Sequence, residues 1–191
     1  MERLIIATSN KGKKREFEEM LPGMRVLCFK DLGLSYDIEE TGSTFFENAL
    51  IKARRVKEDF PEDYVLADDS GLEVEALGGA PGVYTARYAG ENATDGENID
   101  KLLSALENAG NRRAKFVCSL ALVTPAGEVI SAHGESCGEI LKARSGRGGF
   151  GYDPVFFSYD LQKGFGECTE EEKNSVSHRG RAIKELLGKL V

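Results

Sequence analysis

The chain has 191 residues, of which 41% are hydrophobic and 30% charged, and its formal net charge is −7. A chain of this length buries enough surface to fold without disulfides or a structural metal, and we expect a single domain over residues 1–191. Acidic residues outnumber basic ones by 32 to 25, and no basic tract is interleaved with aromatics, so binding to nucleic acid or to anionic membranes is disfavoured. A small anionic substrate is still compatible with this composition where positive groups converge locally.

The cysteines and the start of the chain indicate a cytoplasmic protein. No C-x-x-C pair occurs, and the cysteines lie far apart, mostly in apolar runs. We interpret them as buried thiols in a reducing compartment: Cys28, Cys118, Cys137 and Cys168. The first residues lack the long apolar stretch of a signal peptide, and no window approaches about 18 uncharged apolar residues. We therefore expect neither secretion nor a membrane span.

In the first half of the chain, short apolar runs alternate with helical patterns. Strands are predicted over 3–8, 24–29 and 64–67, helices over 14–21 and 44–60, and two further short strands within 71–90. Thr44 and Glu47 form a capping box at the start of the second helix.

The second half continues the alternation. Thr94 and Glu97 form another capping box, which opens a helix to about Asn108. Two long central strands are predicted over 116–124 and 129–140, followed by a short strand over 155–157 and a helix over 177–190. This order predicts an α/β protein with a mixed sheet.

A small polar loop follows the first predicted strand and precedes the first helix. Its hydroxyls, backbone amides and two ammonium groups stand where a helix dipole is positive, which suits a phosphate. The loop comprises Thr8, Ser9, Asn10, Lys11, Gly12 and Lys13. It lacks the Walker A spacing, and a solvated turn is the alternative interpretation.

Two adjacent carboxylates, Asp68 and Asp69, follow the strand predicted over 64–67. We expect them at the strand end, where side chains of a parallel sheet meet a ligand. Adjacent acids are costly unless a cation neutralises them, and Mg²⁺ is a natural partner for carboxylates that share a site with phosphates. Glu40, in the loop before the second helix, is a candidate third carboxylate. A helix cap or turn also commonly uses such a pair, so a purely structural role is the alternative.

The segment Gly146–Gly151 matches G-x-G-x-x-G, but its context contradicts a dinucleotide site. Such a fingerprint follows a strand and opens a helix, whereas the residues after Gly151 do not start a helix well. Close backbone approach to a ligand is the better interpretation, with Phe150 or Tyr152 available to stack on a flat base. The alternative is a tight hairpin whose aromatics belong to the core.

Donors cluster around the start of the last predicted helix, namely Lys173, Ser177, His178 and Arg179. They suit oxygen acceptors on a base or a phosphate. His133 falls within a strand and is interpreted as structural. Motifs for a zinc hydrolase or a covalent nucleophile do not occur in the sequence, so neither chemistry is supported.

Six segments, taken together and in order, resemble one family. They are residues 8–16, 40–49, 67–71, 78–82, 148–154 and 177–180. The set resembles the Ham1 inosine triphosphate pyrophosphatase family over nearly the whole chain. The resemblance implies Mg²⁺-dependent hydrolysis of ITP, dITP and XTP to the monophosphate and pyrophosphate, which cleanses nucleotide pools of deaminated purines. It also implies a homodimer and a long, twisted mixed sheet flanked by helices, with two lobes and a central substrate cleft.

The resemblance also implies site roles. The loop from Thr8 to Lys13 holds the triphosphate, Glu40 and Asp69 hold the metal, and Asp69 accepts a proton while Asp68 supports the site. The residues implied to contact the rest of the substrate, chiefly its base, are Ser70, Phe150, Gly151, Tyr152, Asp153, Lys173, His178 and Arg179. Two alternatives stay open at this point: a Maf-like nucleotide pyrophosphatase of other base preference, and a nucleotide-binding regulator without turnover.

Overall fold

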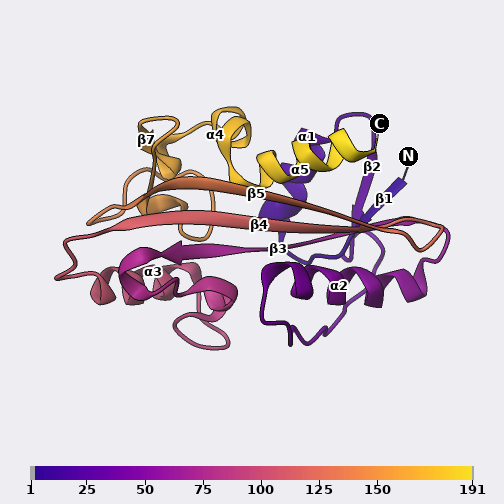
Figure 1. Ribbon diagram of the computed structural model, residues 1–191, viewed down its shortest axis with the longest axis horizontal. Coiled ribbons are helices and arrows are strands. Elements are labelled where there is room, and N and C mark those ends of the chain that lie inside the picture. Colours follow the sequence, from indigo (N-terminus) through magenta and orange to yellow (C-terminus); the bar gives the residue numbers. More distant parts are fainter. Residues whose placement is uncertain (1–2, 191) are drawn as a thin grey trace. The chain divides into compact units, whose positions relative to one another are not determined.

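A computed structural model describes residues 3–190 (Figure 1). The chain forms two compact units. Unit 1 comprises residues up to Asp69, Cys118–Gly134 and Ala182 onward. Unit 2 comprises Ser70–Val117 and Glu135–Arg181. The strands pair in the order β2-β1-β3-β4-β5-β6-β7. Their bounds are β1 Arg3–Ile6, β2 Arg25–Cys28, β3 Tyr64–Val74, β4 Arg113–Val123, β5 Val129–Ile140, β6 Phe156–Ser158 and β7 Lys163–Gly164.

The sheet is mixed, as predicted. β1 pairs parallel with both β2 and β3, whereas β5 pairs antiparallel with β6, and β6 with β7. The helices are α1 Lys11–Met20, α2 Phe45–Asp59, α3 Asp95–Ala105, α4 Glu170–Val176 and α5 His178–Lys189. The predicted α/β class is therefore confirmed. Within the described residues, no helix is long and apolar enough to cross a membrane.

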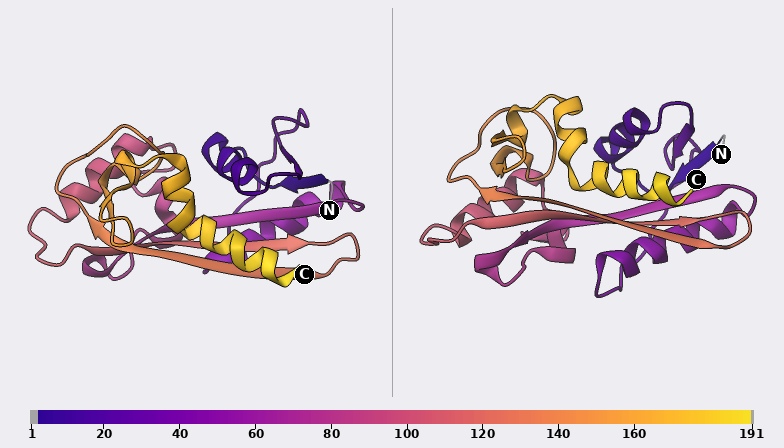
Figure 2. Two further views of the ribbon diagram at one scale, coloured as in Figure 1. Left: turned by 90° about the horizontal axis from the view of Figure 1, so that it is seen from above. Right: turned by 45° about the horizontal axis from the view of Figure 1, so that its top comes forward.

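In unit 1, helices cover both faces of the sheet, because successive side chains of a strand point to opposite faces (Figure 2). Leu4, Ile6 and Leu66 belong to a core with residues of α1 and α5. Ile5 and Val65, one position away, belong to a second core with residues of α2. The continuous apolar character of these strands thus reflects burial on both sides.

Unit 2 has its own core. Leu72 and Val74 at the end of β3 pack in one cluster with Ile99 and Leu102 of α3 and with Phe116 of β4. Aromatic rings fill much of this core, and the rings of Phe116 and Phe156 lie 4.6 Å apart between centroids.

Both predicted capping boxes are present. The Thr44 hydroxyl accepts the amide of Glu47, and the Glu47 carboxylate accepts the amide of Thr44. Thr94 and Glu97 make the same reciprocal pair at the start of α3. A third box at Thr169 opens α4, a helix that the sequence analysis did not predict. The helix predicted from residue 14 begins earlier, at Lys11, because Asn10 caps it.

The prediction for the segment after the acidic pair is wrong. The glycine-rich segment 71–90 holds no two further strands: β3 continues to Val74, and two short 3₁₀ helices follow, Glu75–Leu77 and Gly82–Arg87. Its apolar residues Leu72 and Val74 extend the inward alternation of β3 instead of starting a new strand.

The cysteine prediction is correct only in part. All four cysteines are free thiols, and Cys28 and Cys118 are buried. Cys137 is exposed, because β5 alternates between buried and exposed positions there, and Cys168 is half-buried.

Gly138→Ala is expected to destabilise unit 2. A Cβ at this position of β5 would lie 2.1 Å from the carbonyl oxygen of Phe157 on β6, so the strand must shift. Overpacking of this kind costs about 1–3 kcal/mol, and we expect Tm to fall by roughly 5 °C in a thermal melt. Cys137→Ala, at the exposed neighbouring position, is the control and should leave Tm nearly unchanged. Equal melting temperatures for the two variants would contradict the close approach of β5 and β6.

Candidate active site

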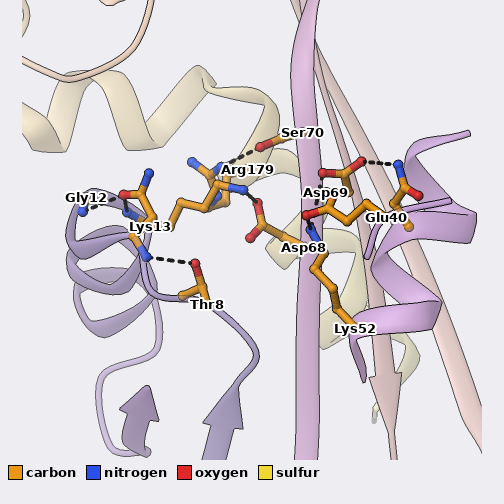
Figure 3. Close-up of polar contacts among 11 residues, drawn as sticks. Thr8, Gly12, Lys13, Glu40, Lys52, Asp68, Asp69, Ser70 and Arg179 are labelled. Carbon is orange, nitrogen blue, oxygen red and sulfur yellow. Dashed lines mark hydrogen bonds and ion pairs between the residues drawn. The ribbon is translucent and has the colours of Figure 1, made fainter. Parts of the chain in front are cut away.

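Asp68 and Asp69 lie in the middle of β3, on opposite faces of the strand (Figure 3). The expectation that they stand at a strand end is wrong, because β3 continues through them to Val74. Alternation along the strand puts Asp68 on the side of Leu66 and α1, and Asp69 on the side of Val65 and α2. Both side chains are buried, so each carboxylate needs its own partners.

The partner of Asp68 comes from α1. The Lys13 ammonium lies 3.0 Å from Asp68 Oδ2, and the Asp68 side chain is fully buried. Lys13 is placed by the start of the helix, where the Asn10 side chain accepts the amides of Gly12 (2.8 Å) and Lys13 (3.1 Å). The Thr8 hydroxyl in turn accepts the amide of Asn10. The loop therefore delivers an ammonium group to the buried carboxylate.

Two backbone amides at the start of α1 are not free for a phosphate, contrary to the interpretation of the sequence. The amides of Gly12 and Lys13 donate to Asn10, so they satisfy the helix cap. Positive character at this end of α1 comes instead from the Lys13 side chain and the helix dipole. Ser9 and Lys11 are exposed beside the cap, whereas Thr8 is buried.

The partners of Asp69 come from α2. Lys52 Nζ lies 3.2 Å from Asp69 Oδ1, and Asn48 Nδ2 donates to Asp69 Oδ2 at 3.2 Å. Asn48 and Lys52 are four residues apart, so they share one face of the helix. Both are buried. Asp69 is thus held by one cation and one amide.

Glu40 joins this group through the same lysine. Its Oε1 lies 3.4 Å from Lys52 Nζ, so one ammonium contacts two carboxylates. The loop that carries Glu40 is tied to α2, because the Gly42 amide donates to Asn48 Oδ1 at 2.8 Å. Asn48 therefore uses its two side-chain groups to connect the Glu40 loop to Asp69.

Burial and charge oppose each other at these groups. Burial raises the pKa of Asp69 above the ordinary value of a carboxyl, and the positive charges of Lys52 and Lys13 offset only part of that shift. Burial lowers the pKa of Lys52, but the negative charges of Asp69, Asp68 and Glu40 outweigh it and raise that pKa overall. Lys52 is accordingly charged at neutral pH, and Asp69 is a stronger proton acceptor than an exposed carboxylate.

The donor set around Lys52 fits a divalent cation. Glu40 and Asp69 already converge on one positive charge, and both offer the oxygen ligands that Mg²⁺ prefers. Within residues 3–190, no group of three or more His, Cys, Asp and Glu side chains is arranged to hold a metal. A magnesium ion typically binds one or two protein carboxylates and completes its shell with water and substrate phosphate, which matches this arrangement.

A second cluster lies within unit 2, around the ring of Phe150. The Lys173 ammonium is 4.6 Å from the ring centroid and 2.7 Å from Asp153 Oδ2. The Arg179 guanidinium carbon is 6.0 Å from the same centroid, and its Nη2 donates to the Ser70 hydroxyl at 2.9 Å (Figure 3). Five of the predicted substrate residues therefore come together from four separate segments of the chain.

Two residues predicted to contact the base, Tyr152 and His178, are instead buried against other parts of the protein. Tyr152 is buried, and its hydroxyl donates to the Thr85 carbonyl at 2.9 Å. The buried His178 ring stacks on Phe116, with centroids 4.8 Å apart. Phe150 is only half-buried, so it is the more accessible of the two aromatics considered for stacking.

Sequence reasoning missed Asn48, Lys52 and Asp95. Asn48 and Lys52 are buried in α2, each directly before a fully buried alanine, Ala49 and Ala53, and polar residues within an otherwise apolar buried face were the available signal. Asp95 accepts the amide of Gly151 at 2.8 Å across 56 residues of sequence, a contact that nothing in the local pattern indicates.

Comparison with known proteins agrees with the resemblance found in the sequence. A model of the Ham1 family matches residues 4–189. A dITP/XTP pyrophosphatase of Clostridium perfringens is 46% identical over 195 residues, which covers 97% of this chain and 96% of the relative. Another, of Staphylococcus aureus, is 44% identical over 186 residues, covering 97% and 95%.

Solved structures show the same fold. The Staphylococcus aureus Ham1 protein superposes with a TM-score of 0.87 at 43% identity, covering 99% of this chain and 98% of that one. A HAM1 protein from Coxiella burnetii gives 0.87 at 42% identity, covering 100% and 98%. Since the family model and these relatives extend over nearly the full length, the chain belongs to the Ham1 family.

Proposed function

We propose that this chain is a metal-dependent hydrolase that converts dITP, ITP and XTP to the nucleoside monophosphate and pyrophosphate. Its relatives named dITP/XTP pyrophosphatase support this substrate class. The observation that carries the proposal is the ion-pair group in which Lys52 of α2 contacts both the buried Asp69 of β3 and the half-buried Glu40 of the loop before α2. Such a group combines a proton acceptor with ligands for a cation, as phosphate chemistry requires.

The triphosphate is assigned to the loop at the start of α1. Lys13 supplies positive charge there, and the loop from Thr8 to Gly12 supplies hydroxyl groups beside it. Asp68 holds the Lys13 ammonium at 3.0 Å and thereby fixes its position. Removing Asp68 would free this long side chain, whose ordering costs entropy that the ion pair offsets.

Mg²⁺ is the metal we assign to Glu40 and Asp69, and when bound it supplies charge neutralisation for phosphate oxygens. Asp69 accepts the proton of the attacking water, and its burial suits that role by raising its pKa. Attack at the α-phosphorus releases pyrophosphate in one displacement, without a covalent intermediate. Asn48 and Lys52 hold both oxygens of the Asp69 carboxylate and so set its orientation.

The base is assigned to unit 2. Phe150 stacks on it, and Lys173 and Arg179, which lie beside that ring, donate toward its oxygen atoms. The 6-oxo group of hypoxanthine and xanthine accepts hydrogen bonds, whereas the 6-amino group of adenine donates them, so cationic donors favour the deaminated bases. We assign Gly151 and Asp153 to the lining of the base site, with the buried Tyr152 and His178 supporting it. The Ser70 hydroxyl accepts a hydrogen bond from Arg179 and so helps to position its guanidinium group.

Two further assignments rest on the family resemblance. We propose that the chain acts as a homodimer and that it works in the cytoplasm. The pool of free nucleoside triphosphates is the substrate that such an enzyme consumes.

Product identification tests the proposed reaction. With dITP and Mg²⁺ we expect dIMP and pyrophosphate in equal amounts, and a chelator should stop the reaction. Asp69→Asn keeps the size of the side chain but loses the proton acceptor and an anionic ligand, so kcat should fall by about 10²–10⁴. Asp160→Asn, at an exposed ion pair with Arg181, is the matched control. Release of dIDP and orthophosphate would rule out attack at the α-phosphorus.

Lys52→Met tests the shared cation without an activity measurement. Loss of the ammonium leaves Glu40 and Asp69 without their common partner, and breaking a buried pair costs about 3–5 kcal/mol. We expect a lower Tm for the metal-free variant and a larger stabilisation by added Mg²⁺ than in the unmodified chain. Arg54→Met, at an exposed position of the same helix, controls for charge removal. An unchanged Tm in both conditions would show that Lys52 does not neutralise the carboxylates.

Arg179→Ala tests recognition of the base. We expect kcat/KM for dITP to fall by roughly one to two powers of ten, with hydrolysis of dATP staying low and nearly unchanged. Because Arg179 is buried, a thermal melt and the Arg179→Lys variant, which keeps a positive charge, separate misfolding from lost recognition. Proportional losses on dITP and dATP would instead place Arg179 at the phosphates, which both nucleotides share.

A further inference from the structure

The loop that carries Phe150 has little conformational restraint of its own. Gly149 and Gly151 flank the aromatic residue, and both have positive φ, 74° and 59°. At Gly149 a Cβ would also lie 2.1 Å from Asp153 Oδ2, whereas at Gly151 nothing stands within 4 Å. Glycine permits these conformations but also permits many others. The position of the Phe150 ring must therefore be set by contacts from outside the two glycines.

Two carboxylates accept the consecutive amides of this loop. The Phe150 amide donates to Asp153 Oδ2 at 2.9 Å, and the Gly151 amide donates to Asp95 Oδ2 at 2.8 Å. Asp153 is buried and paired with Lys173, so it belongs to the base site already described. Asp95 is exposed and lies in the first turn of α3. Its hydrogen bond to Gly151 connects the loop to α3.

α3 is well suited to serve as a fixed support. Its first turn is closed by the Thr94 capping box, and its buried residues Ile99 and Leu102 pack in the core of unit 2. Asn98, also buried, accepts the amide of Ala89 and donates to the carbonyl of Ala86, which ties the preceding segment to the helix.

A second tie reaches the segment that leads into the loop. The Arg144 guanidinium donates to the carbonyl of Gly96 at 3.0 Å and lies 2.8 Å from Asp100 Oδ1. α3 thus contacts the chain both before the loop, at Arg144, and within it, at Gly151. The helix and the loop are held together at two points of the sequence.

We propose that Asp95 is a positioning residue for base recognition: it fixes the Gly151 amide and thereby the orientation of the Phe150 ring. The inference rests on the proposed function, in which Phe150 stacks on the base. Asp95 acts through the loop and makes no contact with the phosphates in this scheme. Its loss should weaken binding of the base while leaving the chemistry at Asp69 intact.

Kinetics of Asp95→Ala test the inference by separating binding from turnover. We expect KM for dITP to rise about tenfold, the effect of one lost hydrogen bond to a charged acceptor, with kcat within about twofold. Inhibition by dIMP, which carries the base, should weaken to a similar extent. Inhibition by pyrophosphate, which lacks a base, should be unchanged.

Two further variants distinguish the hydrogen bond from the charge on the helix. Asp95→Asn keeps an oxygen acceptor but loses the charge, and it should restore most of the affinity for dITP. Glu107→Ala removes an exposed carboxylate just beyond the end of α3, outside both ties to the loop, and should behave like the unmodified chain. If Asp95→Asn is as impaired as Asp95→Ala, or if Asp95→Ala weakens dIMP and pyrophosphate equally, the inference is wrong.

Hydrogen exchange tests the contact independently of catalysis. In Asp95→Ala, amides of peptides spanning 146–155 should exchange faster than in the unmodified chain, whereas peptides of β4 should not change. Unchanged protection of the loop would overturn the positioning role even if the kinetics changed. If the unmodified chain does not hydrolyse dITP, the proposed function fails, while this experiment still decides whether Asp95 holds the loop.

Discussion

The alternation of side chains between the two faces of β3 is the constraint on which the candidate active site depends. It turns two consecutive carboxylates to opposite faces of the strand, so that no single cation in unit 1 serves both equally. Asp68 is neutralised by Lys13 from α1, and Asp69 by Lys52 from α2. Burying a carboxylate without a partner costs several kcal/mol, so each face needs a positive group beside its aspartate, and α1 and α2 supply the two lysines.

The same constraint separates the tasks of the two lysines. Lys13 stands in the first turn of a helix, beside a loop that is partly exposed, and it contacts one carboxylate. Lys52 stands in the middle of a helix and contacts two. The Lys13 ammonium is partly exposed to solvent and pairs with one carboxylate, so it is available to a phosphate. The Lys52 ammonium lies between two carboxylates and keeps Glu40 and Asp69 close together. This difference is why we assign Lys13 to the substrate and Lys52 to the arrangement of the acidic groups.

The sequence predicted the class of the fold and most of its elements, because the capping boxes at Thr44 and Thr94 and the apolar strands are local signals. It misplaced the acidic pair, because aspartate and glycine have low strand propensity, so that the segment 68–71 predicts the end of a strand. In the structure, Leu72 and Val74 carry the strand onward, and their burial in the core of unit 2 outweighs local preference. Lys52 and Asp95 escaped prediction for a related reason: their partners lie 17 and 56 residues away, and contacts of that range leave no periodic pattern.

Side-chain oxygens that accept backbone amides form a second recurring device in both units. The Asn10 side chain accepts the amide of Gly12, and the Asn48 side chain accepts the amide of Gly42. The carboxylate of Asp153 accepts the amide of Phe150, next to Gly149, and the carboxylate of Asp95 accepts the amide of Gly151. In each case the loop contains a glycine and carries, or lies beside, a residue assigned to the substrate or the metal. Glycine lets the backbone of such a loop approach a ligand closely. Ordering a glycine, however, costs more conformational entropy than ordering any other residue. An acceptor on a neighbouring helix or turn offsets part of this cost before the ligand arrives, so that less binding energy is used to order the loop. By this argument, selectivity for a base depends on the acceptors behind the loop as much as on the ring that contacts the base.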